Sequence, residues 1–111
     1  MNLQELAKKI ELLEYHQKLL LQIIKESHQP FYRLVIEKRL SEQTVTEFSF
    51  LCDDLNNRWE QQKAEGFVYF HPLFEEFSSS IPANIHAKEL IEACVNQHFF
   101  APLMRELRKY C

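Results

Sequence analysis

The N-terminal segment of the chain, residues 2–27, repeats apolar residues at alternating steps of three and four. The positions of this stripe are Leu3, Leu6, Ile10, Leu13, Gln17, Leu20 and Ile24. The spacing is the a/d pattern of a coiled coil, extended over about three and a half heptads. It predicts one long helix with a coiled-coil-like face. From Leu19 onward Leu21 and Ile23 widen the apolar face, so we expect this half to be enclosed on more than one side.

The length of this helix limits how well the rest of the chain can cover it. A helix of about 25 residues is roughly 37 Å long. A compact chain of 111 residues has a radius of gyration of about 13 Å, equivalent to a sphere about 34 Å across. We therefore expect residues 2–27 to be an oligomerisation helix that forms a bundle with other subunits, most simply in a homo-oligomer.

Polar residues in the same segment suit a helix that pairs with another helix. Glu5 with Lys9, and Glu14 with Lys18, are spaced for ion pairs one turn apart, with the acid on the N-terminal side. Gln17 is the one polar member of the stripe and occupies an a position. A buried polar residue there can fix the register and the oligomeric state.

The remaining sequence is typical of an all-α protein. One glycine and four prolines leave little material for hairpins or phosphate-binding loops, which need residues with positive φ. We expect a multihelical single domain over residues 1–111, with about five to six helices. After the long helix these lie at about 30–39, about 42–65, from Pro72, about 86–97 and from Pro102, with a short extended segment possible at 67–70. Ser41 is a good N-cap for the third helix, and Gly66 suits the C′ position that ends it.

Charge and cysteine content exclude several classes of partner. Thirteen basic against sixteen acidic residues give a net charge of −3, which makes nucleic acid or an anionic membrane surface an unfavourable partner. Three widely spaced cysteines form neither a zinc motif nor a disulfide framework. No basic and apolar leader opens the sequence, and no apolar run reaches the roughly 18 to 20 residues that span a bilayer. These observations predict a cytoplasmic protein with reduced thiols and no membrane segment.

No pattern in the sequence indicates catalysis or a cofactor. The weak candidates for metal binding are Cys94 and His98, which are four residues apart and would share one face of a continuous helix. Two donors are too few for a structural zinc site, which needs four. We therefore predict no catalytic residue, no cofactor and no metal, with Cys94 as a small core residue.

An aromatic cluster is the remaining candidate site. Its members are Phe67, Tyr69, Phe70, Phe74 and Phe77. These rings supply more apolar area than a short connector needs, and aromatic residues are enriched in interface cores. Three alternatives stay open: the core of the monomer, a subunit interface, and a groove for a small apolar ligand or peptide.

Three stretches of sequence carry a resemblance to a known family. They are residues 13–17 (LEYHQ), residues 30–38 (PFYRLVIEK) and residues 62–68 (QKAEGFV), with a looser match at residues 102–107 (PLMREL). With these stretches the chain resembles the YhaI-like family of small uncharacterised proteins from Bacillus and related Firmicutes. The resemblance implies a helical, oligomeric bacterial protein, and it supplies no catalytic residues.

Three hypotheses for function follow from these observations. The first is a non-catalytic cytoplasmic homo-oligomer that serves as an interaction or scaffold protein. The second is a DNA-associated regulator that uses the helix after Ser41, although Glu42, Glu47, Asp53 and Asp54 give its outer face the wrong sign for phosphate contact. The third is a small enzyme or ligand binder whose site forms between subunits.

Overall fold

The computed structural model describes all residues from 1 to 111 and consists of six helices with no strand. The helices are α1 (Leu3–Glu26), α2 (Pro30–Glu37), α3 (Glu42–Ala64), α4 (His71–Ser80), α5 (Ala87–Asn96) and α6 (Ala101–Arg108). The prediction of an all-α fold with a long N-terminal helix is confirmed. The segment 67–70, considered as an extended stretch, joins α3 to α4 without forming a strand.

Side chains and prolines set the N-terminal ends of several helices. The side-chain oxygen of Asn2 accepts a hydrogen bond of 2.8 Å from the backbone N–H of Glu5 at the start of α1. The hydroxyl of Ser41 accepts one of 3.1 Å from the N–H of Thr44, which confirms Ser41 as the N-cap of α3. Pro30 opens α2, where a missing N–H removes no intrahelical bond.

Gly66 ends α3 in the predicted way. Its φ of 95° is in the left-handed region, its N–H bonds to the carbonyl of Lys63, and the N–H of Phe67 bonds to the carbonyl of Gln62. These two bonds define a Schellman motif with Gly66 at C′.

Three other helices end on a left-handed residue that is not glycine. His28, Arg39 and His98 have φ of 61°, 55° and 60° and follow the C-caps of α1, α2 and α5. Side chains with a Cβ disfavour this region by about 1–2 kcal/mol each. A single glycine in the sequence therefore did not limit the number of left-handed positions, because the hydrogen bonds of the helix ends impose them.

Replacing Arg39 with glycine is expected to stabilise the protein. Arg39 is exposed and forms no ion pair, so the substitution removes backbone strain without breaking a salt bridge. After the larger entropy of an unfolded glycine is subtracted, we expect a gain of about 0.5–1 kcal/mol in urea unfolding. Arg39→Ala keeps the Cβ and should give no such gain. Equal stability of the two variants would contradict the strain argument.

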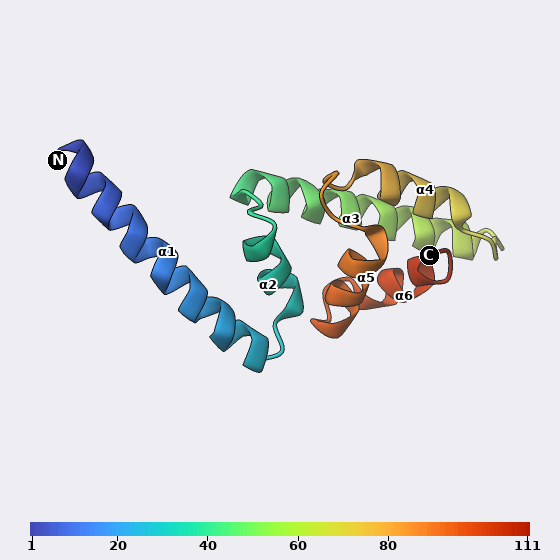
Figure 1. Cartoon of the computed structure of the whole chain (residues 1–111). Helices are drawn as coiled ribbons and strands as arrows, with labels where there is room; N and C mark the ends of the chain where they lie inside the picture. The colour runs from blue at the N-terminus through green and yellow to red at the C-terminus, as the bar shows by residue number, and fades with distance from the viewer.

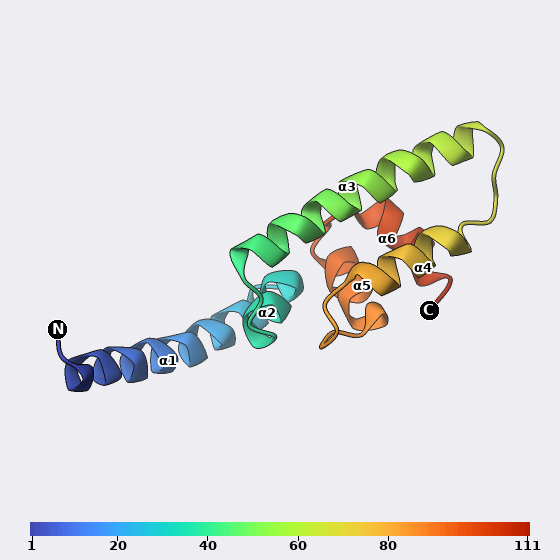
Figure 2. The ribbon, with the colours of Figure 1, turned by 90° about the horizontal axis from the view of Figure 1, so that it is seen from above.

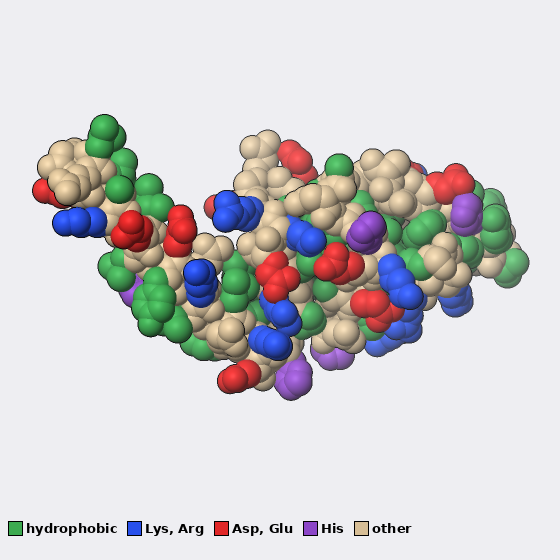
Figure 3. Space-filling model, viewed as in Figure 1, with side chains coloured by type: hydrophobic (Ala, Val, Ile, Leu, Met, Phe, Trp, Pro, Cys, Tyr) green, Lys and Arg blue, Asp and Glu red, His purple; other side chains and the backbone are tan.

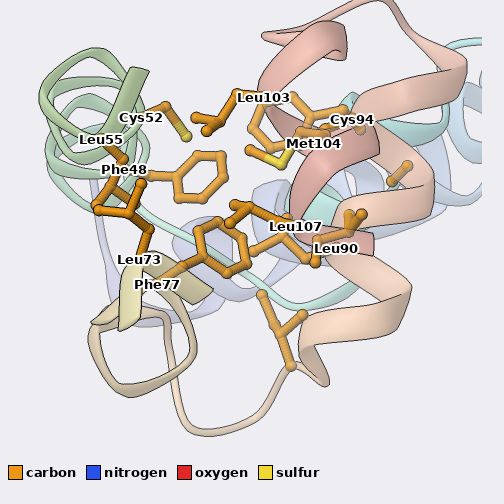
Figure 4. Close-up of a cluster of buried hydrophobic side chains, with 14 of the residues drawn as sticks. Phe48, Cys52, Leu55, Leu73, Phe77, Leu90, Cys94, Leu103, Met104 and Leu107 are labelled. Carbon is orange, nitrogen blue, oxygen red and sulfur yellow. The ribbon is translucent and has the colours of Figure 1, made fainter. Parts of the chain in front are cut away.

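The hydrophobic core is built by α2 to α6. It contains 17 buried residues, and none of them comes from α1. Figure 4 shows its centre, where side chains from α3 and α4 meet those from α5 and α6. The labelled residues are Phe48, Cys52, Leu55, Leu73, Phe77, Leu90, Cys94, Leu103, Met104 and Leu107. We call residues 30–111 the helical body.

The first helix projects away from the helical body (Figures 1 and 2). The molecule measures 62 × 28 × 19 Å, and its radius of gyration is 17.4 Å, against about 13 Å for a compact chain of this length. α1 contacts mainly α2, whereas α5 packs with both α2 and α6. The expectation that the chain cannot cover its own long helix is therefore met by the fold.

A side chain from beyond α5 fastens α2 to the body. The side-chain oxygen of Gln97 accepts hydrogen bonds of 2.8 Å and 3.2 Å from the N–H groups of Phe31 and Tyr32, 65 or more residues away in sequence. The ring of Phe31 stacks on that of Phe99 at 5.0 Å. Gln97 thus supplies the cap that α2 lacks locally, since the side chain of Gln29 forms none.

Removing this cap should loosen α2. Gln97→Ala leaves two helix-terminal N–H groups without their acceptor, and we expect a loss of about 1–2 kcal/mol in the free energy of unfolding. Gln97→Glu keeps an acceptor oxygen and adds a charge that suits a helix N-terminus, so it should stay within about 0.5 kcal/mol of the native protein. Urea unfolding measures both, and equal losses in both variants would contradict the capping role.

Candidate interaction surface

The a/d stripe of α1 is exposed to solvent along most of its length. The apolar residues Leu3, Leu6, Ile10, Leu13 and Leu20 are between 44% and 84% exposed. Figure 3 shows hydrophobic side chains at the surface along this projecting helix. A row of large aliphatic side chains of this extent is uncommon on an isolated soluble surface and is typical of an interaction site.

One flank of α1 is partly covered by α2. Leu21 and Ile24 are half-buried where the two helices meet. Further along, the helices diverge and leave an open hollow of about 280 Å³ that is lined by residues including Gln17, Leu21 and Ile36. Gln17 itself is exposed. The predicted register residue is therefore placed at the edge of the uncovered surface.

The opposite flank of α1 carries a second exposed apolar row. Leu12, Leu19 and Ile23 are 54%, 45% and 60% exposed. Successive residues of a helix turn by about 100°, so Leu19 points about 160° away from Leu21. The structure thus covers the widened half of α1 on one side only. Leu12 was missed as a candidate because it lies outside the a/d positions, although its step of seven to Leu19 was visible in the sequence.

The charged residues of α1 form no ion pairs within the chain. Every salt bridge of the structure joins residues of the helical body. The expected pairs Glu5 with Lys9 and Glu14 with Lys18 are not formed, which corrects the prediction. Exposed pairs of this kind are worth only about 0.3–0.5 kcal/mol, so hydration competes with them.

The aromatic cluster divides between the core and the surface. Phe70 and Phe77 are buried in the core, and Phe74 packs against it while half-exposed. Phe67 and Tyr69 are 53% and 62% exposed. The structure therefore does not bring the five rings together into one groove, because the turn after α3 points part of the connector outward.

The exposed part of the cluster lies at the far end of the body from α1. Phe67, Val68 and Tyr69, which we call the tip, form the connector at the right-hand end of Figure 1. Tyr69 packs against the C-terminal segment, since the centre of its ring lies 5.8 Å from that of Tyr110. The hydroxyl of Tyr110 accepts a hydrogen bond of 2.9 Å from the N–H of Phe70. The tip is thus a small apolar surface held in place by the end of the chain.

The two weak candidates for metal binding do not share a helix face. α5 ends at Asn96, and His98 follows in the left-handed conformation with its side chain exposed. Cys94 is fully buried in the core. The expectation that the pair could point at one ion is wrong, because the helix stops between the two residues. The structure contains no group of three or more His, Cys, Asp or Glu side chains able to hold a metal ion.

The three thiols differ in their surroundings. Burial raises the pKa of Cys94 to about 12. Burial also raises the pKa of Cys52, and the neighbouring Cys94 thiol adds to this effect. Cys111 is exposed at the end of the chain. Since the thiolate is the reactive form, the two core thiols are poor nucleophiles.

Thiol labelling should distinguish the terminal cysteine from the core pair. At pH 8 a soluble disulfide reagent is expected to modify one thiol per chain quickly, and the other two only after unfolding. Cys111→Ser should abolish the fast reaction. If the fast reaction persists in Cys111→Ser, the burial of Cys52 or Cys94 is contradicted.

No helix of the structure combines the length and the apolar character that crossing a membrane requires.

A known family model matches nearly the whole of this chain. The family model described as "protein of unknown function (DUF1878)" matches residues 3–111. The match begins at the first residue of α1. The exposed helix therefore belongs to the pattern that defines the family and is not an addition to it.

Proposed function

The chain belongs to the DUF1878 family of proteins of unknown function, and we propose that it works as a non-catalytic homo-oligomer, an interaction or scaffold protein whose subunits assemble through α1. A single observation carries the proposal. α1 is 24 residues long and has no buried residue, yet its a/d positions are filled by leucine and isoleucine except at Gln17.

The energetics of an uncovered helix support assembly. Isolated helices are only marginally stable in water, and most helices in proteins are stabilised by packing of their apolar face. Each exposed leucine or isoleucine that becomes buried contributes about 1.5–3 kcal/mol. A partner that covers the stripe would thus supply the stabilisation that the body does not provide.

The other two hypotheses gain less support. Glu42, Glu47, Asp53 and Asp54 are all exposed on α3, so that helix presents negative charge where a DNA-reading helix needs positive charge. The hollows of the structure open to solvent, and none of them is lined by three or more His, Cys, Asp or Glu side chains able to hold a metal ion. An enzyme site between subunits would need residues that a second copy brings.

The location of the protein and its closer family are proposed from the sequence. Three free cysteines suit the reducing cytoplasm, where we place the protein. Within the DUF1878 family, the resemblance to the YhaI-like proteins stays a prediction.

Amide hydrogen exchange tests whether α1 is covered in solution. If α1 pairs with another copy, its amides should be protected from exchange, and the protection should rise with protein concentration. The amides of α3 serve as an internal reference, since that helix belongs to the body. Unprotected α1 amides at every concentration, alongside protected α3 amides, would contradict assembly through α1.

A further inference from the structure

We infer that the partner of α1 is the α1 helix of one second copy, and that the two helices run parallel and in register as a two-stranded coiled coil. This inference rests on the proposed function and adds the number, direction and alignment of the helices. Four observations support it: the identity of the a and d residues, the place of Gln17, the charges beside the stripe, and the flank that α2 occupies.

The core positions favour two strands. Two of the four a positions, Ile10 and Ile24, are β-branched, and all three d positions are leucine. β-branched residues at a with leucine at d select two-stranded parallel coiled coils over higher oligomers.

Gln17 favours parallel alignment. In a parallel pair each a residue meets the same residue of the other chain, so two Gln17 amides can hydrogen-bond to each other. In an antiparallel pair a positions meet d positions, and Gln17 would face one of the d leucines of the other copy. A buried amide against a leucine is left without a partner, which costs about 1–3 kcal/mol.

The charged residues beside the stripe also favour a parallel pair. Lys9 occupies a g position and Glu14 the next e position, and neither forms an ion pair within its own chain. Parallel, in-register helices bring g against the following e of the partner, which gives two symmetric Lys9 to Glu14 pairs. Antiparallel helices bring e against e and g against g, so no such pair forms.

The position of α2 leaves room for this partner. It partly covers Leu21, at an e position, and Ile24, the last a residue, whereas the stripe from Leu3 to Leu20 and the g residue Ile23, which is 60% exposed, are open. Parallel pairing then places both helical bodies at the same end of the coiled coil. The dimer would be two-headed, with one copy of the tip Phe67–Tyr69 on each body.

Cysteine cross-linking at equivalent positions tests direction and register. In a Cys111→Ser background, Leu6→Cys and Leu20→Cys should each give a disulfide-linked dimer on mild oxidation, because in-register d positions face each other. In an antiparallel pair the two copies of Leu6 would be about 15 Å or more apart along the axis, whichever d leucine faces Gln17, beyond the roughly 7 Å between Cα atoms that a disulfide allows. Lys8→Cys, on the outer face, is the matched control and should not cross-link.

A charge exchange gives a second measurement that needs no new thiol. Lys9→Glu should raise the dissociation constant of the dimer about tenfold. The double variant with Glu14→Lys should restore it. Absence of cross-links and of rescue in an assembly that remains dimeric would overturn the parallel arrangement and leave the proposed function intact. A native chain that is monomeric would overturn both.

Discussion

Leu13→Glu is expected to convert the assembly into monomers. Leu13 is a d residue near the middle of α1 and is 66% exposed in the single chain. In a pair of helices the substitution removes two buried leucines and sets two carboxylates against each other. The combined cost of several kcal/mol predicts a dissociation constant raised by at least about 100-fold, measured by sedimentation velocity over a dilution series.

The helical body should be indifferent to this substitution. No α1 residue belongs to the core. In the monomeric chain, the free energy of unfolding of the body in urea is therefore expected to change by less than about 0.5 kcal/mol. Gln22→Glu, on the outer face of α1, adds the same charge and should leave the assembly intact. Dissociation by both variants would indicate that charge, and not the stripe, controls assembly.

Phe77→Ala is expected to be the most destabilising single substitution we consider. Phe77 is fully buried in α4, and its ring meets that of Phe48 edge-on at 6.0 Å. Truncating a buried phenylalanine costs about 3–5 kcal/mol, against a total of about 5–15 kcal/mol for a typical domain. Urea unfolding at fixed protein concentration measures the loss.

Phe50→Ala is the matched control for this prediction. Phe50 lies on α3 and is 70% exposed, so the same truncation should cost less than about 0.5 kcal/mol. Similar losses in the two variants would contradict the assignment of Phe77 to the core.

The helices were predictable from the sequence because the local signals, apolar spacing and capping residues, agree with the way the helices pack in the folded chain. In α3 the apolar step from Phe48 to Cys52, Leu55 and Trp59 matches the four residues that the structure buries. Gly66 ends the same helix as expected, since a left-handed residue was needed there and glycine adopts that conformation without strain.

Contacts between distant segments were not predictable from one sequence. The cap that Gln97 places on α2 joins residues more than 60 positions apart, and no local pattern marks it. The left-handed conformation of His98 breaks the helix that Cys94 and His98 were expected to share. The sequence does not show that the ring of Phe67 is exposed and that of Phe77 is buried. This difference depends on the path of the chain after α3.

The candidate site was predictable as a pattern but not as a surface. The a/d spacing identified the stripe, and its length indicated that the body would not cover it. The turn at His28 sends α2 back beside α1 and so decides which flank α2 occupies. The same turn leaves open the second apolar row, formed by Leu12, Leu19 and Ile23.

Sedimentation equilibrium of the native chain tests the central claim most directly. The chain has a mass of 13.4 kDa, and pairing through α1 predicts a species of twice that mass at micromolar concentration, dissociating only on strong dilution. A single species of 13.4 kDa throughout the micromolar range would contradict assembly through α1.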